Sequence, residues 1–431
     1  MKRLISAALI WLMAAPAGAL TLTELQQEAI GTRHTVKAAQ AQADIAEMKE
    51  KEAKSPFLPS LDATYSASKI NRETLAQEKE KSDAFKASLS MNVFSGFSDS
   101  YTLKAAKRTA QAGQHTLSGT ARDVNHSVAL AFLGVYKSRQ NLKVTQNAAK
   151  LYQDRYRQFK LKYDVGVLKK RDLLKVKVEM DNALQDVRKS QAAARAAVNN
   201  LALAVGRGFT ADEIKNLDFT LFEKTPQTID AHQGLEAMKS RNSDLQAMRE
   251  KLSASAMRKK AARAAYMPRV DLTAAYTSLH TDDYTFRSNA TNGDDVRVTA
   301  TVSINLFDGM KKQAKISQAA LAEASMRHQL MEQERNLTTQ FENTILDRKV
   351  AEENLAVAQS GLAEADENLR ITDLAFDQGL ATSTEVLDAI FGLSRARFNH
   401  ITALTDLFAT HFDLQRLTQG YPGIIGNSGR P

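Results

Sequence analysis

The sequence predicts a mainly α-helical protein with a smaller transmembrane β portion, built from one structural unit that occurs twice. Three observations predict this fold: a duplication of the chain, a helical seam with a period of 3.5 residues, and four segments that alternate apolar with polar residues. The 431 residues include no cysteine, which excludes disulfide bonds and thiolate metal sites.

The duplication is visible in short motifs that return at a constant spacing. The sequence NVFSG at 92–96 returns 213 residues later as NLFDG at 305–309, and YDVG at 163–166 returns at the same shift as FDQG at 376–379. A period this long exceeds the roughly 20–50 residues of solenoid repeats. We therefore expect two homologous halves that assemble side by side.

The repeats divide the chain into five parts. We expect a signal peptide over 1–19, a first repeat over 20–208, a linker over 209–233, a second repeat over 234–420 and a short tail over 421–431. The first part has a charged start, an apolar stretch and a small-residue cleavage site, as signal peptides do. A membrane anchor would need about 20 apolar residues, and this stretch is shorter.

Each repeat contains a long helical pattern that is broken once by glycine. Positions spaced alternately by four and three residues from Val124 onward, and again from Leu337 onward, are mostly apolar. This seam predicts a helix over about 98–163 and its copy in the second repeat, each followed by a shorter returning helix that ends near Leu203 or Leu417. The hairpin tips are expected at 164–168 and 377–381. Further helical stretches are expected around 22–54 and 234–264.

The four alternating segments predict strands at about 60–70, 84–94, 269–279 and 295–307. Each has the length that a tilted strand needs to cross a bilayer. An ordinary sheet packed on a core is the alternative, but the rest of the chain offers only long, narrow helices as a core. The polar linkers 71–83 and 281–294 would be outer loops. Four strands cannot close a barrel, and open edges are not tolerated in hydrocarbon, so we expect oligomerisation; three copies would supply twelve strands.

These residues resemble the TolC family of trimeric outer-membrane channel proteins. The resemblance rests on FLPSL at 57–61, NVFSG at 92–96 and the tips DVGVL and DQGLA, in a duplicated order. It implies a homotrimer with a 12-stranded β-barrel in the outer-membrane lipid, continued by a 12-helix α-barrel in the periplasm. It also implies docking on a periplasmic adaptor protein and an inner-membrane ABC or proton-driven transporter. The function implied is a passive exit duct for type I protein secretion or multidrug efflux, without a cofactor.

The resemblance also assigns roles to individual residues. The tips that contact the adaptor correspond to Val165, Gly166, Val167, Gln378, Gly379 and Leu380. The acidic constriction of the periplasmic entrance corresponds to Glu385, Asp388 and Asp172. Family members often carry an Arg just after the second tip glycine that ties the closed entrance, whereas this chain has Ala381.

The charges around the two tips suggest a replacement for that Arg. The segment 155–177 is strongly basic, and the segment 364–388 is strongly acidic. Our hypothesis is that the first segment closes the entrance by ion pairs to the second, with the gate residues Lys169, Lys170, Arg171, Asp377 and Glu385. Solvated charge with a role in adaptor docking is the alternative.

Other functions find little support in the sequence. The eight His residues form no HExxH motif, and the scattered charge argues against nucleic-acid binding. The sequence GRGFTA at 206–211 formally fits a dinucleotide-binding fingerprint, but it follows a helix, so helix termination is the better interpretation. The alternative function is a periplasmic coiled-coil structural or adaptor protein that does not span the membrane. It explains the helices but not four alternating strands at repeated positions.

Overall fold

The computed structural model describes residues 20–70, 80–227, 230–282 and 293–419. The expected signal peptide and C-terminal tail lie outside the described residues, as does most of the two expected outer loops. The chain forms two compact units, and each of the two long helices contributes residues to both units. The two units are described separately below.

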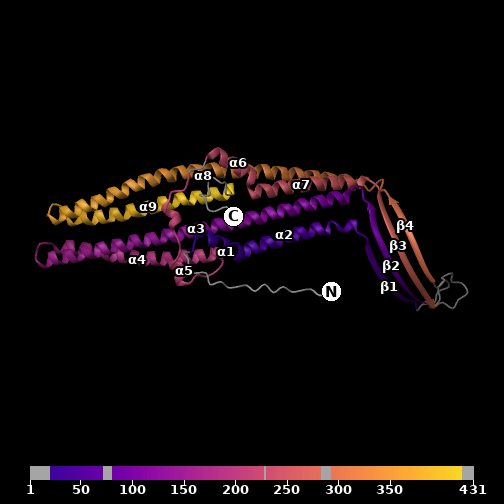
Figure 1. Ribbon diagram of the computed structural model, residues 1–431, viewed down its shortest axis with the longest axis horizontal. Coiled ribbons are helices and arrows are strands. Elements are labelled where there is room, and N and C mark those ends of the chain that lie inside the picture. Colours follow the sequence, from indigo (N-terminus) through magenta and orange to yellow (C-terminus); the bar gives the residue numbers. More distant parts are fainter. Residues whose placement is uncertain (1–19, 71–79, 228–229, 283–292, 420–431) are drawn as a thin grey trace. The chain divides into compact units, whose positions relative to one another are not determined.

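The first unit comprises residues 38–119 and 240–336 and contains the only sheet among the described residues. Its strands form an antiparallel meander in the order β1-β2-β3-β4. One end of this sheet continues into helices, partly through the short 3-10 helices η1 (Ser55–Phe57) and η3 (Ala264–Tyr266) (Figure 1). The elements are α2 (His34–Glu52), β1 (Ser60–Ile70), β2 (Glu80–Phe94), α3 (Ser98–Asp164), α7 (Ser243–Arg263), β3 (Arg269–Asp282), β4 (Gly293–Ser303) and α8 (Lys311–Asp377).

The strand register gives the sheet one apolar and one polar face. Leu61 pairs with Leu89, which pairs with Ala274 on β3, and Ala274 pairs with Val298 on β4. Because side chains alternate between faces, the apolar residues of all four strands lie on the same side. Leu61 is 73 % exposed and Val298 is 69 % exposed, so no core of this chain covers that face.

Three strands differ in extent from the sequence prediction. The third strand ends at Asp282 rather than 279, because its ladder with β2 continues to the pair of Lys81 and Asp282. The second strand begins at Glu80 rather than 84, because Ile70 pairs with Glu80 and extends the ladder. The fourth strand ends at Ser303 rather than 307, because Ser303 pairs with Arg269, the first residue of β3. Pro268 precedes Arg269 and has no N–H to donate, so the ladder cannot continue there.

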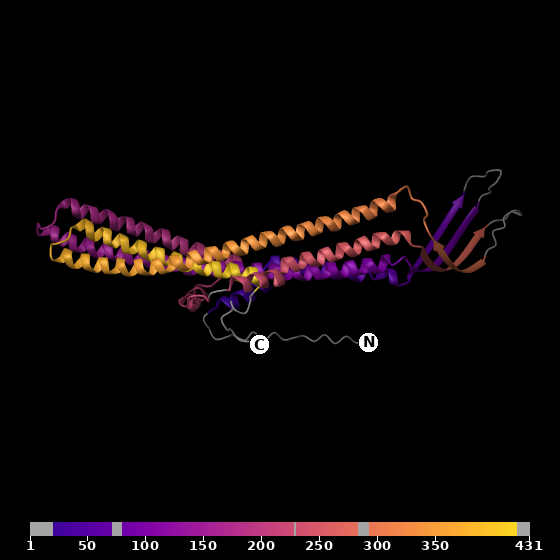
Figure 2. The ribbon, with the colours of Figure 1, turned by 90° about the horizontal axis from the view of Figure 1, so that it is seen from above.

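The second unit comprises residues 20–37, 120–239 and 337–419 and contains both helical hairpins. The helices α3 and α8 have 67 residues each and return through α4 and α9, which have 36 residues each. The two hairpins run alongside each other (Figure 2) and share an apolar core drawn from all four helices. The further elements are α1 (Leu22–Thr32), α4 (Lys170–Val205), α5 (Ala211–Lys215), η2 (Thr220–Glu223), α6 (Ala231–Arg241) and α9 (Ser383–Thr418).

Both shorter helical stretches are interrupted, which the apolar pattern does not indicate. The stretch 22–54 is split at Arg33, whose backbone is extended and caps α1. The stretch 234–264 is split at Asn242, whose side chain accepts hydrogen bonds from the backbone N–H groups of Asp244 at 3.0 Å and Leu245 at 3.3 Å. An Asn that satisfies two free N–H groups starts a new helix. Among the described residues, no helix is both long and apolar enough to span a membrane.

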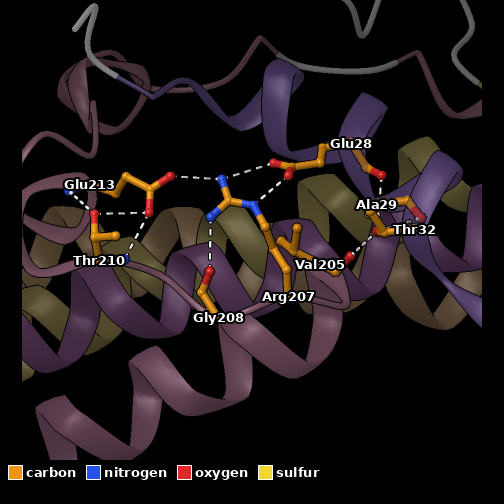
Figure 3. Close-up of polar contacts among 8 residues, drawn as sticks. All are labelled: Glu28, Ala29, Thr32, Val205, Arg207, Gly208, Thr210 and Glu213. Carbon is orange, nitrogen blue, oxygen red and sulfur yellow. Dashed lines mark hydrogen bonds and ion pairs between the residues drawn. The ribbon is translucent and has the colours of Figure 1, made fainter. Parts of the chain in front are cut away.

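The end of α4 is a helix terminus and not a nucleotide site, as the sequence position of GRGFTA indicates. Gly206 adopts the left-handed conformation with φ +89° and caps α4 through an N–H bond to the carbonyl of Ala202. Arg207 then binds the carboxylates of Glu28 and Glu213 (Figure 3). These bonds occupy the guanidinium and raise the pKa of Arg207 further.

The linker between the repeats is held by a buried arginine. Arg348 lies on the helical seam of α8, and its guanidinium donates to the carbonyl oxygens of Pro226 at 3.1 Å and Gln227 at 2.9 Å. It also binds Glu352 at 2.9 Å. The corresponding seam position in the first repeat, 213 residues earlier, is the buried Val135. The seam is therefore apolar in one repeat and polar at the same place in the other.

Candidate functional site: the paired hairpin tips

The two hairpin tips have the same backbone structure. In the first tip the N–H groups of residues 165, 166, 167 and 168 donate to the carbonyls of residues 161, 163, 162 and 162. In the second tip the N–H groups of residues 378, 379, 380 and 381 donate to the carbonyls of residues 374, 376, 375 and 375. Every partner is displaced by 213 residues. The duplication therefore includes a helix C-terminal motif of the Schellman type, bond for bond.

A glycine makes each turn possible. Gly166 has φ +80° and Gly379 has φ +76°, a region that residues with a Cβ atom rarely adopt. A Cβ built on either glycine would meet no atom within 4 Å. The requirement for glycine is therefore conformational, and the tip surface around it is open.

Apolar side chains project from both tips into solvent. Val165 and Val167 are each 74 % exposed, and Leu380 is 80 % exposed. Gln378 of the second tip is also exposed. Isolated exposed apolar residues are common on proteins, but here they are concentrated on two turns of the same geometry.

The core directly beneath the tips joins the two hairpins. Phe159 of α3 stacks on Phe376 of α8 with ring centres 5.2 Å apart, and both residues belong to the shared apolar core. The ammonium group of Lys162 lies 4.1 Å from the centre of the Phe376 ring. Leu168 and Ala381, the last residues of the two turns, pack against this core. The tips are therefore positioned by one shared apolar cluster.

The three acidic residues assigned to the entrance have different environments. Glu385 closes a capping box at the start of α9: its carboxylate accepts from the N–H of Thr382 at 2.5 Å, and Thr382 accepts from the N–H of Glu385 at 3.3 Å. The bond from the Thr382 backbone, followed by its hydroxyl, lowers the pKa of Glu385. Asp388, one turn further, is exposed. Asp172 is half-buried, 3.5 Å from the guanidinium of Arg171.

The charge of Asp388 on α9 also affects a tyrosine of the other hairpin. The pKa of Tyr152, on α3, is raised to about 12 by burial first and then by the charges of Glu179 and Asp388. Tyr152 lines an open groove of about 500 Å³ that is bordered by α3, α4 and α9. Of the two α9 residues that the resemblance assigns to the constriction, Glu385 therefore serves as a helix cap, whereas the charge of Asp388 acts on Tyr152 of the neighbouring hairpin.

Within one chain, the gate residues do not pair with one another. Among the described residues, no ion pair joins Lys169, Lys170 or Arg171 to Asp377 or Glu385; Arg171 pairs with Asp172 of its own helix. The basic and acidic segments instead meet through a hydrogen bond from Lys175 to the hydroxyl of Thr384 at 3.2 Å, and through an ion pair between Arg155 and Asp373.

The ion pair that joins the two hairpins near the tips is formed by Arg155 of α3 and Asp373 of α8. The Arg155 side chain is 9 % exposed and also donates to Gln158 at 2.8 Å. Burial raises the pKa of Asp373, the charge of Arg155 opposes this shift, and Asp377 adds to it. Sequence reasoning missed Arg155, although its position, three residues after Tyr152 and four before Phe159, places it on the seam side of the helix.

Comparison with known proteins identifies the family. The family model described as outer membrane efflux protein matches residues 25–207 and 234–419, which is most of the chain. The chain belongs to this family. It is therefore an outer-membrane protein that extends into the periplasm, and its family consists of efflux channels and not of enzymes. This membership contradicts the alternative of a periplasmic protein that stays outside the membrane.

Individual relatives agree with this assignment. The outer membrane efflux protein BepC of Brucella suis biovar 1 (strain 1330) is 26% identical over 157 residues, which cover 36% of this chain and 33% of BepC. The aligned region thus spans about a third of that curated relative.

Solved structures of outer-membrane proteins share the fold over nearly the whole chain. VceC from Vibrio cholerae matches with a TM-score of 0.79 and 17% identity, covering 93% of this chain and 96% of VceC. The CmeC outer membrane channel of Campylobacter jejuni matches with a TM-score of 0.80 and 15% identity, covering 93% of this chain and 85% of CmeC. The fold is that of TolC-like channel-tunnels, in which a β-barrel continues into a helical barrel, as the sequence predicts.

Proposed function

We propose that this outer membrane efflux protein is the exit duct of a tripartite export system and docks through its hairpin tips on a periplasmic adaptor. The observation that carries this proposal is the pair of tips with the same backbone turn and exposed apolar side chains, Val165 and Val167 on one and Leu380 on the other. Apolar groups held rigidly in water favour a protein partner. The adaptor in turn connects to an inner-membrane ABC or proton-driven transporter.

The proposed duct is a homotrimer. The meander leaves β1 and β4 as edge strands, and strand directions alternate along the sheet, so β4 of one protomer can pair antiparallel with β1 of the next. Unpaired strand edges are strongly disfavoured in hydrocarbon. Three protomers would close a twelve-stranded barrel and bring six tips together, three of each kind.

Photo-crosslinking from position 167 or 380 tests the docking. A photoreactive residue at either position should form an adduct with the adaptor in an exporting strain. The same residue at Lys143, which is exposed on α3 outside the tips, serves as the control. An exporting strain that yields no adduct from either tip would contradict the docking proposal.

For the cargo, we propose efflux of small molecules rather than protein secretion; the descriptions of the family and of BepC contain the word efflux and name no cargo. Deleting the gene should then raise the accumulation of toxic compounds, with no change in the set of secreted proteins. Loss of a secreted protein together with unchanged drug tolerance would assign the duct to type I secretion instead.

The gate hypothesis concerns contacts between protomers. In a closed ring the two kinds of hairpin alternate, so Lys169, Lys170 and Arg171 of one hairpin would face the acidic tip of its neighbour. Reversing Lys170 and Arg171 to Glu should increase single-channel conductance, and adding Asp377→Lys and Glu385→Lys should restore closure. Conductance that stays unchanged at low salt, where screening is weakest, would rule out this lock.

A further inference from the structure

Positive charge is concentrated where the sheet continues into helices. The four segments 48–56, 98–108, 256–266 and 308–318 contain thirteen Lys and Arg against four Asp and Glu. This excess of nine is as large as the net charge of the whole chain. We call the basic residues of these four segments the basic collar.

Most of the basic collar is exposed and lacks an acidic partner. Lys54 pairs with Glu50 at 3.1 Å, Arg108 pairs with Glu250 at 3.1 Å, and Lys259 pairs with Glu323. The remaining lysines carry charge that no acidic group of this chain neutralises by an ion pair within the described residues. Those that are exposed are Lys49, Lys51, Lys104, Lys107, Lys260, Lys311 and Lys315.

Exposed apolar side chains lie between the basic collar and the strands. They belong to the turns and short 3-10 helices at the helix end of the sheet: Phe57, Leu58, Phe97, Tyr266, Met267, Leu306, Phe307 and Met310. Lysines of the collar lie over neighbouring aromatic rings, with Lys312 5.5 Å from the Tyr266 ring centre and Lys104 5.4 Å from that of Tyr101. The cations and the aromatic side chains therefore share one surface.

The opposite end of the sheet has the opposite balance. The outer ends of the four strands, 66–70, 80–84, 278–282 and 293–297, contain three Lys and Arg against five Asp and Glu. Among the described residues, an excess of positive charge is therefore found at the helix-end boundary of the apolar sheet face and not at its outer end. Since the helices extend into the periplasm, this boundary lies at the periplasmic leaflet of the outer membrane.

We propose that the basic collar binds the phosphate groups of anionic phospholipids in the periplasmic leaflet. An apolar band followed by lysines matches the boundary between acyl chains and headgroups, where long cationic side chains reach toward phosphate. Juxtamembrane Lys and Arg clusters attract anionic lipids in proportion to their number. This interaction requires only the inserted sheet and is independent of the proposed adaptor and transporter.

Native mass spectrometry of the detergent-purified full-length protein tests the proposal. With equal amounts of phosphatidylglycerol and phosphatidylethanolamine added, the wild type should retain more phosphatidylglycerol. The variant Lys107→Gln, Lys260→Gln, Lys311→Gln removes three exposed collar charges from three helices and should lower the retention ratio at least about five-fold. Replacing the same residues by Arg preserves the charge and should preserve the ratio, which separates lost binding from a damaged fold.

A charge-matched control lies on the same long helix but outside the collar. The variant Lys143→Gln, Lys150→Gln, Lys160→Gln removes three exposed charges from α3 and should leave the lipid ratio unchanged. Equal retention of the two lipids by the wild type, or an equal drop in both variants, would overturn the proposal. Preferential retention of lipopolysaccharide would overturn it too. A changed anion permeability with an unchanged lipid ratio would place these charges in the duct and would equally contradict the proposal.

Discussion

The ion pair between Arg155 and Asp373 makes stability depend on pH through its carboxylate. Burial disfavours the Asp373 carboxylate and raises its pKa, although Arg155 opposes the shift. The native state therefore binds this proton more tightly than the unfolded chain, so the contribution of Asp373 to stability becomes less favourable as the pH rises through its titration. The pair thus links the two hairpins although burial disfavours the charged form of Asp373.

Removing either partner alone should therefore destabilise the protein at neutral pH, because each single substitution leaves the other group without its partner. Arg155→Met leaves the carboxylate of Asp373, which is 31 % exposed, and Asp373→Asn leaves the guanidinium of Arg155, which is 9 % exposed. Each change should lower the unfolding free energy by about 1–3 kcal/mol, whereas the double variant should lose less than the sum of the two. Thermal unfolding of both single variants and of the double variant measures these losses. A double variant that loses the full sum would contradict this account.

A buried histidine gives the helical unit a defined response to acid. Burial, and secondarily the charge of Arg348, lowers the pKa of His411 to about 4. Below the ordinary pKa of about 6.5 the unfolded chain binds a proton that the native state does not, so stability decreases as the pH falls. The expected loss between pH 7 and pH 5 is about 2 kcal/mol. His411→Leu should abolish this loss in thermal unfolding, whereas His328→Gln, at an exposed position, should retain it.

At the scale of the elements, the glycine turns give a sharp expectation. Gly166→Val or Gly379→Val forces a β-branched residue into positive φ at a strain of about 1–3 kcal/mol. The altered tip should abolish export while membrane insertion and oligomeric state, assayed by heat-modifiable migration, remain normal. Gly→Asn at the same positions should retain export because Asn tolerates this conformation. Full export by both valine variants would show that the tip geometry is not required.

The elements that could be predicted from the sequence are the periodic ones. The apolar seam is repeated over many helical turns, and the apolar-polar alternation is repeated over whole strands. A single exceptional residue therefore does not hide either pattern, and the two hairpins and four strands can be predicted. The breaks at Arg33 and Asn242 depend on one local conformation or one side-chain cap, which leaves no periodic signal. The Arg155–Asp373 pair depends on how α3 and α8 are aligned along their axes, and the apolar pattern of one helix does not specify this alignment.

At the scale of the whole molecule, the two faces of the sheet should tolerate charge unequally. Leu89→Arg or Val298→Arg places charge on the apolar face and should cost about 2–4 kcal/mol near the bilayer midplane. Ser88→Arg or Thr299→Arg, one residue away on the polar face, should have a much smaller effect. Refolding into lipid vesicles, followed by denaturant titration, measures both pairs. Equal costs on the two faces would contradict the lipid assignment of the apolar face.

The anchoring of the linker by Arg348 makes the two halves of the gene product non-interchangeable. The first repeat has valine at the matching seam position, so a chimaera of two first repeats would offer the linker carbonyls at 226 and 227 no guanidinium. A chimaera of two second repeats would instead place an extra guanidinium at the first seam position, where Val135 is fully buried. The two repeats are therefore not equivalent, because only the second repeat carries the arginine that binds the carbonyls of Pro226 and Gln227.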